Sequence, residues 1–306
     1  MKAQTKKFSG VFAALLTPRK ADDSVDIAAL SRLVQFQLSK GVSSFALNGA
    51  TGELCLARSE HLRTTLETVR VASEGRATVL CGVGAPGVSL ARELSAIAEE
   101  GGAAGLLLPM PWFFRYEQED LEAFCKAVAS GTKLPVLLYN LPQFCSALEK
   151  ETVRKLIADV PNIIGIKDSG SSLEILRDLT ESGLDACRLV GNDPVLRPAL
   201  SEGVCDGVVS GIACVLPELI LALYAEGLRA AAGEFDDCWR LLREVAKKMD
   251  SLPTPWALKW FAEARGIFEA SFAQPLSAER AAQGIELEEW FCDWFPSTVP
   301  DGAITS

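Results

Sequence analysis

Residues 163–170 read IIGIKDSG, an apolar run that carries one lysine, Lys167, near its end and then breaks into a polar turn. An uninterrupted run of this kind predicts a strand that is buried on both faces. Burial disfavours the charged form of a lysine, and a neutral lysine amine attacks carbonyl groups to form a Schiff base. On this stretch alone, a lysine that reaches solvent or pairs with Asp168 is the simpler interpretation, because short motifs also match by chance.

Short apolar segments and segments of helical period alternate along most of the chain. The expected strands cover residues 11–16, 44–48, 77–82, 105–108, 135–139, 163–167, 188–191 and 207–210. The expected helices cover residues 27–39, 59–72, 89–99, 119–129, 151–158, 173–180, 195–201 and 217–225. Buried strands that alternate with amphipathic helices indicate parallel βα units with right-handed crossovers.

Eight such units predict an α/β fold, a closed (β/α)8 TIM barrel, over residues 1–232. A doubly wound open sheet is the alternative. Such a sheet usually carries Gly-x-Gly-x-x-Gly after its first strand, and residues 17–20, TPRK, do not begin that pattern. The barrel is therefore the favoured fold.

The strand pattern stops near residue 233. Residues 235–249, 255–265 and 278–295 predict helices that are separated by proline and glycine. These segments are rich in tryptophan and phenylalanine, for which plain core packing is the preferred interpretation and packing on the barrel or on another subunit is the alternative. The sequence thus predicts a C-terminal helical region over residues 233–306.

The composition is that of a globular enzyme rather than a nucleic-acid or membrane protein. The 306 residues include 49% hydrophobic and 23% charged side chains, and the formal net charge is −10. An acidic chain argues against a nucleic-acid partner, because phosphate binding needs clustered cations. The longest apolar runs fall short of the ~18 residues of a membrane span, and no signal-peptide pattern opens the chain.

Cysteine and histidine usage narrows the chemistry further. The nine cysteines are dispersed and none form a Cys-x-x-Cys pair, which favours reduced thiols in a cytoplasmic protein. His61 is the single histidine and is expected to be a surface or capping residue. Its isolation excludes Ser-His-Asp triads and histidine-rich metal sites.

In a barrel of this type, reactive side chains lie where the strands end. Lys167 ends the sixth expected strand, and Tyr139 ends the fifth, so the two are neighbours in barrel order. A phenol beside an imine nitrogen can carry protons to and from the substrate. A lone tyrosine at a strand end is more often a packed residue, but the adjacent lysine favours the catalytic interpretation.

Three further strand ends carry polar groups. The second is followed by residues 48–53, NGATGE, in which glycines flank Thr51. Successive N–H groups and a hydroxyl suit a carboxylate, although an ordinary glycine turn would look the same. Asp193 follows the seventh strand, and Ser210 ends the eighth. Asp193 either holds a substrate hydroxyl or caps the next helix.

These segments, in this order, resemble the dihydrodipicolinate synthase / N-acetylneuraminate lyase family of class I aldolases. Five strings carry the resemblance, which runs from about residue 8 to beyond residue 259: GATGE at 49–53, YNLP at 139–142, GIKD at 165–168, GVVSG at 207–211 and PWALK at 255–259. The resemblance implies a (β/α)8 barrel with a C-terminal helical region. It also implies a lysine–pyruvate Schiff base, no metal or organic cofactor, and a homotetramer of tight dimers or a homodimer.

The resemblance assigns roles to individual residues. Lys167 matches the imine-forming lysine, and Tyr139 matches the tyrosine that relays protons and positions the substrate. The turn at Ala50 and Thr51 matches the binder of the pyruvate carboxylate, and Val209 matches an apolar residue of the pyruvate pocket. Three polar residues are candidates for the rest of a hydroxylated substrate: Ser169, Asp193 and Ser210.

Three positions depart from the family pattern. Ala50 stands where a second hydroxyl residue is common, and Phe113 stands where a tyrosine often reaches a neighbouring subunit's site. Phe144 stands where the synthases carry an arginine for the carboxylate of their second substrate. An apolar group does not pair with a carboxylate. The synthase is therefore ranked below an aldolase for sugar acids or hydroxy-oxo acids.

The favoured function is a metal-independent class I lyase. It would cleave or form a 4-hydroxy-2-oxo acid, such as a 2-keto-3-deoxy sugar acid, with pyruvate and an aldehyde as partners. The synthase itself and a sugar-acid dehydratase that uses the same imine are alternatives. An alternative of another class is a catalytically reduced relative that binds a 2-oxo acid, which Ala50 and Phe113 would explain.

Overall fold

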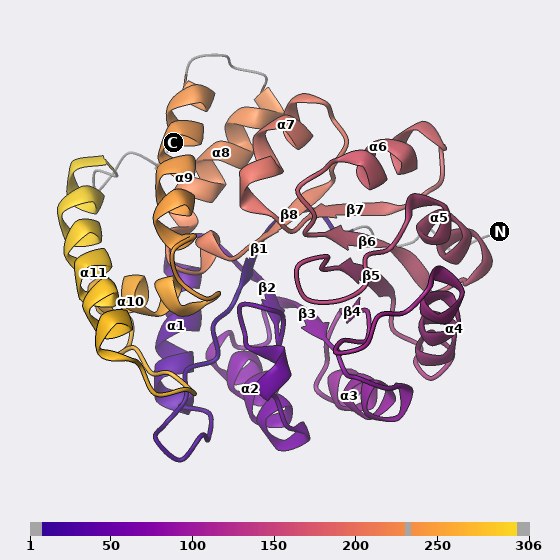
Figure 1. The fold of residues 1–306 in the computed structure, drawn as a ribbon, viewed down its shortest axis with the longest axis horizontal. Coiled ribbons are helices and arrows are strands. Elements are labelled where there is room, and N and C mark those ends of the chain that lie inside the picture. The colour runs from indigo at the N-terminus through magenta and orange to yellow at the C-terminus, as the bar shows by residue number, and fades with distance from the viewer. Residues whose placement is uncertain (1–7, 230–233, 299–306) are drawn as a thin grey trace.

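The computed structural model describes residues 8–229 and 234–298 and contains the predicted barrel. Eight parallel strands pair with their neighbours in chain order, and β8 closes on β1 (Figure 1). The strands are β1 (Gly10–Ala14), β2 (Ser44–Leu47), β3 (Thr78–Gly82), β4 (Gly105–Pro109), β5 (Val136–Asn140), β6 (Ile163–Asp168), β7 (Cys187–Val190) and β8 (Gly207–Ser210).

Helices cover the outside of the barrel. They are α1 (Ile27–Ser39), α2 (Ser59–Ala72), α3 (Val88–Glu100), α4 (Gln118–Ala129), α5 (Lys150–Asp159), α6 (Glu174–Glu181), α7 (Leu196–Ser201) and α8 (Pro217–Arg229). Figure 1 shows these helices arranged around the strands in chain order. Asp26 starts α1 by accepting a hydrogen bond from the Ala29 N–H at 3.0 Å, as expected of an N-terminal cap.

Side-chain alternation along the strands produces two apolar layers. Leu107 points into the barrel with Leu80 and Leu137, whereas Leu106 and Leu108 join the larger cluster between strands and helices. Both faces of each strand are therefore buried, which is why the strands appear in the sequence as continuous apolar runs. All six residues of β6 are buried, so the prediction for this segment is confirmed.

The first strand is shorter than predicted. It ends at Ala14, two residues before the expected end at residue 16. The Leu15 N–H still bonds to the Ala46 carbonyl at 3.0 Å, but the Leu16 N–H turns to the Cys214 thiol at 3.4 Å. The chain therefore leaves the barrel at this point because its next donor finds a partner outside the strand ladder.

Three helices follow the barrel: α9 (Glu234–Met249), α10 (Trp256–Ala264) and α11 (Ala278–Thr298). Figure 1 shows them on one side of the molecule, beside α1 and α8. Phe261 of α10 and Phe291 of α11 stack with ring centroids 4.3 Å apart, and Arg265 pairs with Glu218 of α8 at 2.9 Å. The predicted boundary between residues 232 and 233 lies outside the described residues and stays a prediction.

The hydropathy of the helices gives one further result. Among the residues that the structure describes, no helix combines the length and the apolar character that crossing a membrane requires.

Candidate active site

A cavity of about 480 Å³ opens at the carboxyl ends of the strands. Loops after β2, β5, β6, β7 and β8 line it, and the segment from Ala246 to Leu258 closes one side. Met249 and Leu252 from this C-terminal segment line the cavity. The aromatic content of the C-terminal region had predicted plain core packing. The structure shows that this region also lines the cavity, which was not predicted.

Lys167 and Tyr139 meet at the base of this cavity. The two residues are paired in the register of β5 and β6, and both side chains therefore point to the same side of the sheet. The Lys167 Nζ lies 3.8 Å from the centroid of the Tyr139 ring. Only 4% of Lys167 and 2% of Tyr139 are exposed, so the amine does not reach solvent as a surface lysine would.

Asp168 is not the partner of Lys167. Its Oδ1 accepts hydrogen bonds from the Asn140 side-chain amide and from the Gly170 N–H, each at 2.9 Å. Burial raises the pKa of Asp168, and these two donors oppose the rise. The simpler interpretation of the lysine, exposure or pairing with Asp168, does not describe this structure.

The turn after β2 brings Thr51 to the cavity. Asn48 and Glu53 bracket the turn with positive φ angles of 52° and 56°, and the Asn48 side-chain amide donates to the Gly82 carbonyl at 2.7 Å. A Cβ placed on Gly211 would lie 3.3 Å from the Thr51 hydroxyl, so glycine there leaves room for the threonine. Ala50 and Thr51 both line the cavity, and they follow β2, which lies across the barrel from β6 and Lys167.

Asp193 follows β7, lines the cavity and is buried. Its Oδ2 accepts the Ile212 N–H at 3.2 Å, and its Oδ1 has no hydrogen-bond partner among the described residues. Burial raises the pKa of Asp193, while the Ser210 hydroxyl, the Ile212 N–H and the charge of Lys167 oppose the rise. A buried carboxylate oxygen without a partner is uncommon, which makes Asp193 a candidate to bond to a ligand.

Ser210, Val209 and Ser169 occupy different positions around the cavity. Ser210 is fully buried behind Asp193, accepts the Ala213 N–H at 2.9 Å and does not line the cavity. Val209 lines it from inside the barrel. Ser169 also lines it, with its hydroxyl donating to the Gly191 carbonyl at 3.0 Å.

Gly191 keeps the space beside the lysine open, which leads to a first prediction. A Cβ at Gly191 would lie 2.2 Å from the Ser169 Oγ and 2.7 Å from the Lys167 Cε. Gly191→Ala is therefore expected to displace the amine and to slow borohydride trapping of pyruvate by about a hundredfold. Gly87→Ala, where a Cβ meets nothing within 4 Å, is the control. Equal trapping rates in the two variants would contradict the placement of Lys167.

Two buried polar contacts were not expected from the sequence. The Lys259 Nζ donates to both carboxylate oxygens of Glu53, at 3.0 and 2.9 Å, directly behind the Thr51 turn. His61, expected at the surface, is only 8% exposed, so that prediction was wrong. Its Nδ1 lies 3.0 Å from Nη1 of the equally buried Arg19. Burial and the charge of Arg19 lower the pKa of His61.

The three departures from the family pattern all lie at or beside the cavity. Phe144 lines it and is 59% exposed, and Ala50 lines it next to Thr51. Phe113 is 87% exposed and does not line this cavity. Among the described residues that form the wall, Lys167 is the only lysine or arginine.

Comparisons with known proteins point to one family. The family model described as "Dihydrodipicolinate synthetase family" matches residues 7–289. The 4-hydroxy-tetrahydrodipicolinate synthase of Shewanella sp. (strain ANA-3) is 33% identical over 264 residues, which are 85% of this chain and 89% of that protein. The structure of the 4-hydroxy-tetrahydrodipicolinate synthase of Methylacidiphilum fumariolicum SolV matches with a TM-score of 0.87 and 26% identity, over 95% of this chain and 98% of that one.

The same architecture occurs in a sialic acid aldolase. The enzyme of Ruminococcus gnavus matches with a TM-score of 0.85 over 96% of this chain and all of that one. At 21% identity, this likeness shows the fold alone. The chain belongs to the dihydrodipicolinate synthetase family, a family of lyases that act through a lysine Schiff base without a cofactor.

Proposed function

We propose that this member of the family is an aldolase that cleaves or forms a 4-hydroxy-2-oxo acid, with pyruvate as one partner. The observation that carries the proposal is the buried Lys167, whose Nζ lies 3.8 Å from the ring centroid of Tyr139 in a cavity with no other lysine or arginine among its described lining residues. Such a cavity suits one carboxylate beside one nucleophilic amine.

The proposed reaction begins with imine formation. The N–H groups and hydroxyl of the Ala50–Thr51 turn bind the substrate carboxylate, and Val209 packs against the carbon chain. The Lys167 amine attacks the keto carbon, and water leaves as the imine forms. The protonated imine then accepts the electron pair of the C3–C4 bond. Tyr139 takes the proton of the C4 hydroxyl as that bond breaks and the aldehyde departs.

The remaining steps restore the enzyme. The enamine left on Lys167 takes a proton at C3, and water hydrolyses the imine to release pyruvate. The products together contain the atoms of the substrate, because the water lost at the start returns at the end. The same steps in reverse order form the C3–C4 bond from pyruvate and an aldehyde.

We propose that Ser169 and Asp193 bind the polar groups of the second half of the substrate. The raised pKa of Asp193 and its unpartnered Oδ1 support a hydrogen bond to a substrate hydroxyl. Ser210 supports this role, since its hydroxyl opposes the rise in the pKa of Asp193. We therefore propose Ser210 as a residue that positions Asp193 rather than one that touches substrate.

Two measurements test the proposed function. Pyruvate and borohydride should add one reduced pyruvate to Lys167, detected by peptide mass spectrometry. A panel of 4-hydroxy-2-oxo acids, including 2-keto-3-deoxy sugar acids, should then release pyruvate in a coupled lactate dehydrogenase assay. Water loss without pyruvate release would favour the dehydratase, and trapping without turnover on any substrate would favour a catalytically reduced protein.

A second candidate is 4-hydroxy-tetrahydrodipicolinate synthesis, because the curated relatives at 30–33% identity carry that name. The wall of the cavity argues against it: Phe144 stands where a cation would bind the second carboxylate, and Lys167 is the only described lining cation. Condensation of pyruvate with aspartate semialdehyde, followed with dihydrodipicolinate reductase, separates the two. Efficient turnover there would replace the aldolase proposal.

Tyr139→Phe gives a further prediction. The change keeps the ring that lies 3.8 Å from the Lys167 Nζ and removes only the phenolic hydroxyl. Imine trapping should persist, while pyruvate release from a 4-hydroxy-2-oxo acid should fall by about 10²–10⁴-fold, the usual worth of a positioned acid or base. Tyr224→Phe, which removes a hydroxyl bonded to the Asp206 carbonyl away from the cavity, is the control. Unchanged turnover in Tyr139→Phe would assign the proton relay to another group.

Two broader expectations remain proposals. The dispersed cysteines, all nine of which are free thiols, support a reducing cytoplasmic setting. The predicted homotetramer or homodimer is supported by the exposed aromatic pair Phe113 and Phe114, whose rings meet edge to face at 5.0 Å.

A further inference from the structure

His61 and Arg19 form a buried contact that the proposed mechanism does not use. The Nδ1 of His61 on α2 lies 3.0 Å from Nη1 of Arg19, which lies in the loop between β1 and α1, and both side chains are buried. An arginine guanidinium carries only donors and is not deprotonated in proteins. The Nδ1 atom must therefore accept the hydrogen bond, which fixes His61 as the neutral imidazole with its proton on Nε2.

A proton on Nδ1 would turn this contact into a repulsion, because two cations would then face each other at 3.0 Å without an acceptor between them. The other charged groups that face His61 are Asp23 and Glu60, which favour its protonation, and Arg58, which opposes it. The side chains of these three residues are 41–71% exposed, so water screens them. Burial and the charge of Arg19 prevail and lower the pKa of His61.

Arg19 is connected to the turn that carries Thr51 by a chain of hydrogen bonds. The Arg19 N–H donates to the Ser271 hydroxyl at 3.4 Å, and the Ser271 carbonyl accepts a bond from the Lys259 Nζ at 2.8 Å. Lys259 also donates to both carboxylate oxygens of Glu53, at the end of the turn. Burial lowers the pKa of Lys259, and the charge of Arg19 adds to that fall. The position of Arg19 therefore acts on the ion pair behind Thr51.

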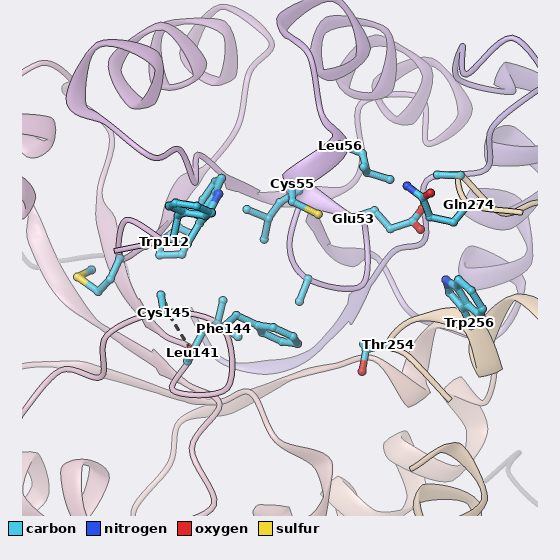
Figure 2. Close-up of a pocket in the computed structure, with 16 residues that line it drawn as sticks. Glu53, Cys55, Leu56, Trp112, Leu141, Phe144, Cys145, Thr254, Trp256 and Gln274 are labelled. Atoms are coloured by element: carbon cyan, nitrogen blue, oxygen red, sulfur yellow. Dashed lines mark hydrogen bonds between the residues drawn. The ribbon is translucent and has the colours of Figure 1, made fainter. Parts of the chain in front are cut away.

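The segment around Ser271 lies against the same turn. Gln274, three residues further along the chain, lines one pocket together with Glu53, and Figure 2 shows the two side chains next to each other. Arg19 in turn holds its own loop, since Nη1 donates to the Asp23 carbonyl at 3.1 Å and to the Asp23 Oδ1 at 3.2 Å. A displaced Arg19 side chain would thus disturb its loop and the segment that supports Glu53.

We propose that His61 and Arg19 position the turn that binds the substrate carboxylate, and that a proton on His61 loosens this turn and weakens the binding of 2-oxo acids. The proposal rests on the proposed function, because that function assigns the carboxylate to the turn at Thr51. The neutral imidazole holds the guanidinium, and the loop of Arg19 keeps Ser271 against Lys259. The imidazolium repels the guanidinium and weakens these contacts. Neither His61 nor Arg19 lines the cavity, so both are positioning residues.

The first test follows the protonation of His61 directly. His61 is the single histidine of the chain, so the signals of ¹³C-labelled histidine in NMR spectra belong to this residue alone. The untagged full chain is titrated from about pH 8 to about pH 5, around the ordinary histidine pKa, with and without saturating pyruvate. Because the coupling between proton and ligand is reciprocal, pyruvate should lower the pKa of His61 further.

The second test uses His61→Gln, which keeps an acceptor for Arg19 but does not titrate in this pH range. The pyruvate concentration for half-maximal cyanoborohydride trapping is compared at each pH, so that the chemistry at Lys167 affects both proteins equally. As the pH falls from about 8 to about 5, the wild-type value should rise by about fivefold relative to that of His61→Gln. Glu67→Gln, which breaks an exposed pair with Arg70 on the same helix, is the control and should follow the wild-type protein.

The outcomes separate this proposal from the function on which it rests. If pyruvate is trapped at no pH, the aldolase function fails and this proposal fails with it. If pyruvate is trapped but leaves the titration of His61 unchanged, or if His61→Gln keeps the pH dependence of the wild-type protein, the aldolase function stands and the positioning role is wrong. A purely structural contact gives this last result, with lower stability of His61→Gln in urea as its only effect. The NMR titration uses the unaltered chain and decides the proposal even where the variant does not fold.

Discussion

Replacement of Lys167 by methionine is expected to abolish borohydride trapping of pyruvate and to lower aldol turnover by about 10⁴-fold or more, since the loss of a covalent nucleophile is among the most costly changes to an enzyme. Methionine is unbranched and fills the space above the Tyr139 ring without an amine. It also removes a polar group that is only 4% exposed, so thermal unfolding should show a stability equal to or above that of the wild-type protein.

Lys155→Met is the matched control for this change. Lys155 is more than half exposed on α5, pairs with Glu122 at 2.8 Å and does not line the cavity. Trapping and turnover should be unaffected there. Undiminished labelling of Lys167→Met, with the added mass on another lysine peptide, would show that the nucleophile has been assigned to the wrong residue.

The barrel could be predicted because its signal is repeated along the chain. Each strand is buried on both faces, so each appears as an apolar run, and β8 and α1 have the predicted bounds. Lys167 and Tyr139 could be predicted as neighbours for the same reason: consecutive strands of a barrel pair in register, and strand ends meet at one rim. Local pattern and topology together sufficed for these two residues.

Contacts between distant polar groups could not be predicted in this way. Lys259 and Glu53 are 206 residues apart, and no periodicity indicates which buried cation meets which carboxylate. The burial of His61 could not be predicted either, because its partner Arg19 lies 42 residues away in the chain. Ser210 ends its strand as predicted, but its hydroxyl accepts the Ala213 N–H and the residue does not line the cavity. The PWALK string at residues 255–259 pointed to Lys259, but nothing in the sequence indicated which residue pairs with it.

Breaking the Glu53–Lys259 pair is expected to have the largest effect on stability. Glu53 is 8% and Lys259 3% exposed, and the Lys259 Nζ also donates to the Ser271 carbonyl at 2.8 Å. Glu53→Gln leaves a buried ammonium without its counter-charge, which costs about 3–5 kcal/mol in the free energy of unfolding. Because Glu53 ends the turn that carries Thr51, the pyruvate concentration for half-maximal trapping should also rise.

The pH dependence of Glu53→Gln identifies the cause of its loss. Burial lowers the pKa of Lys259, and the charge of Glu53 opposes that fall, so removal of Glu53 should lower the pKa further. A lysine whose pKa is lower in the folded state binds fewer protons there than in the unfolded state. Stability must therefore rise as pH increases between the two pKa values. The deficit of Glu53→Gln, measured by urea unfolding, should shrink as the pH is raised towards the ordinary lysine pKa.

Two further variants separate the loss of the pair from the uncompensated charge of Lys259. Glu53→Gln combined with Lys259→Met removes both members of the pair and should recover most of the lost stability, since a buried ion pair contributes little net stability relative to apolar groups of similar size. Glu67→Gln breaks an exposed pair with Arg70 on α2 and should leave the melting temperature near that of the wild-type protein. If the double variant is as unstable as Glu53→Gln alone, or if Glu53→Gln behaves like Glu67→Gln, the uncompensated charge of Lys259 is not what the pair prevents.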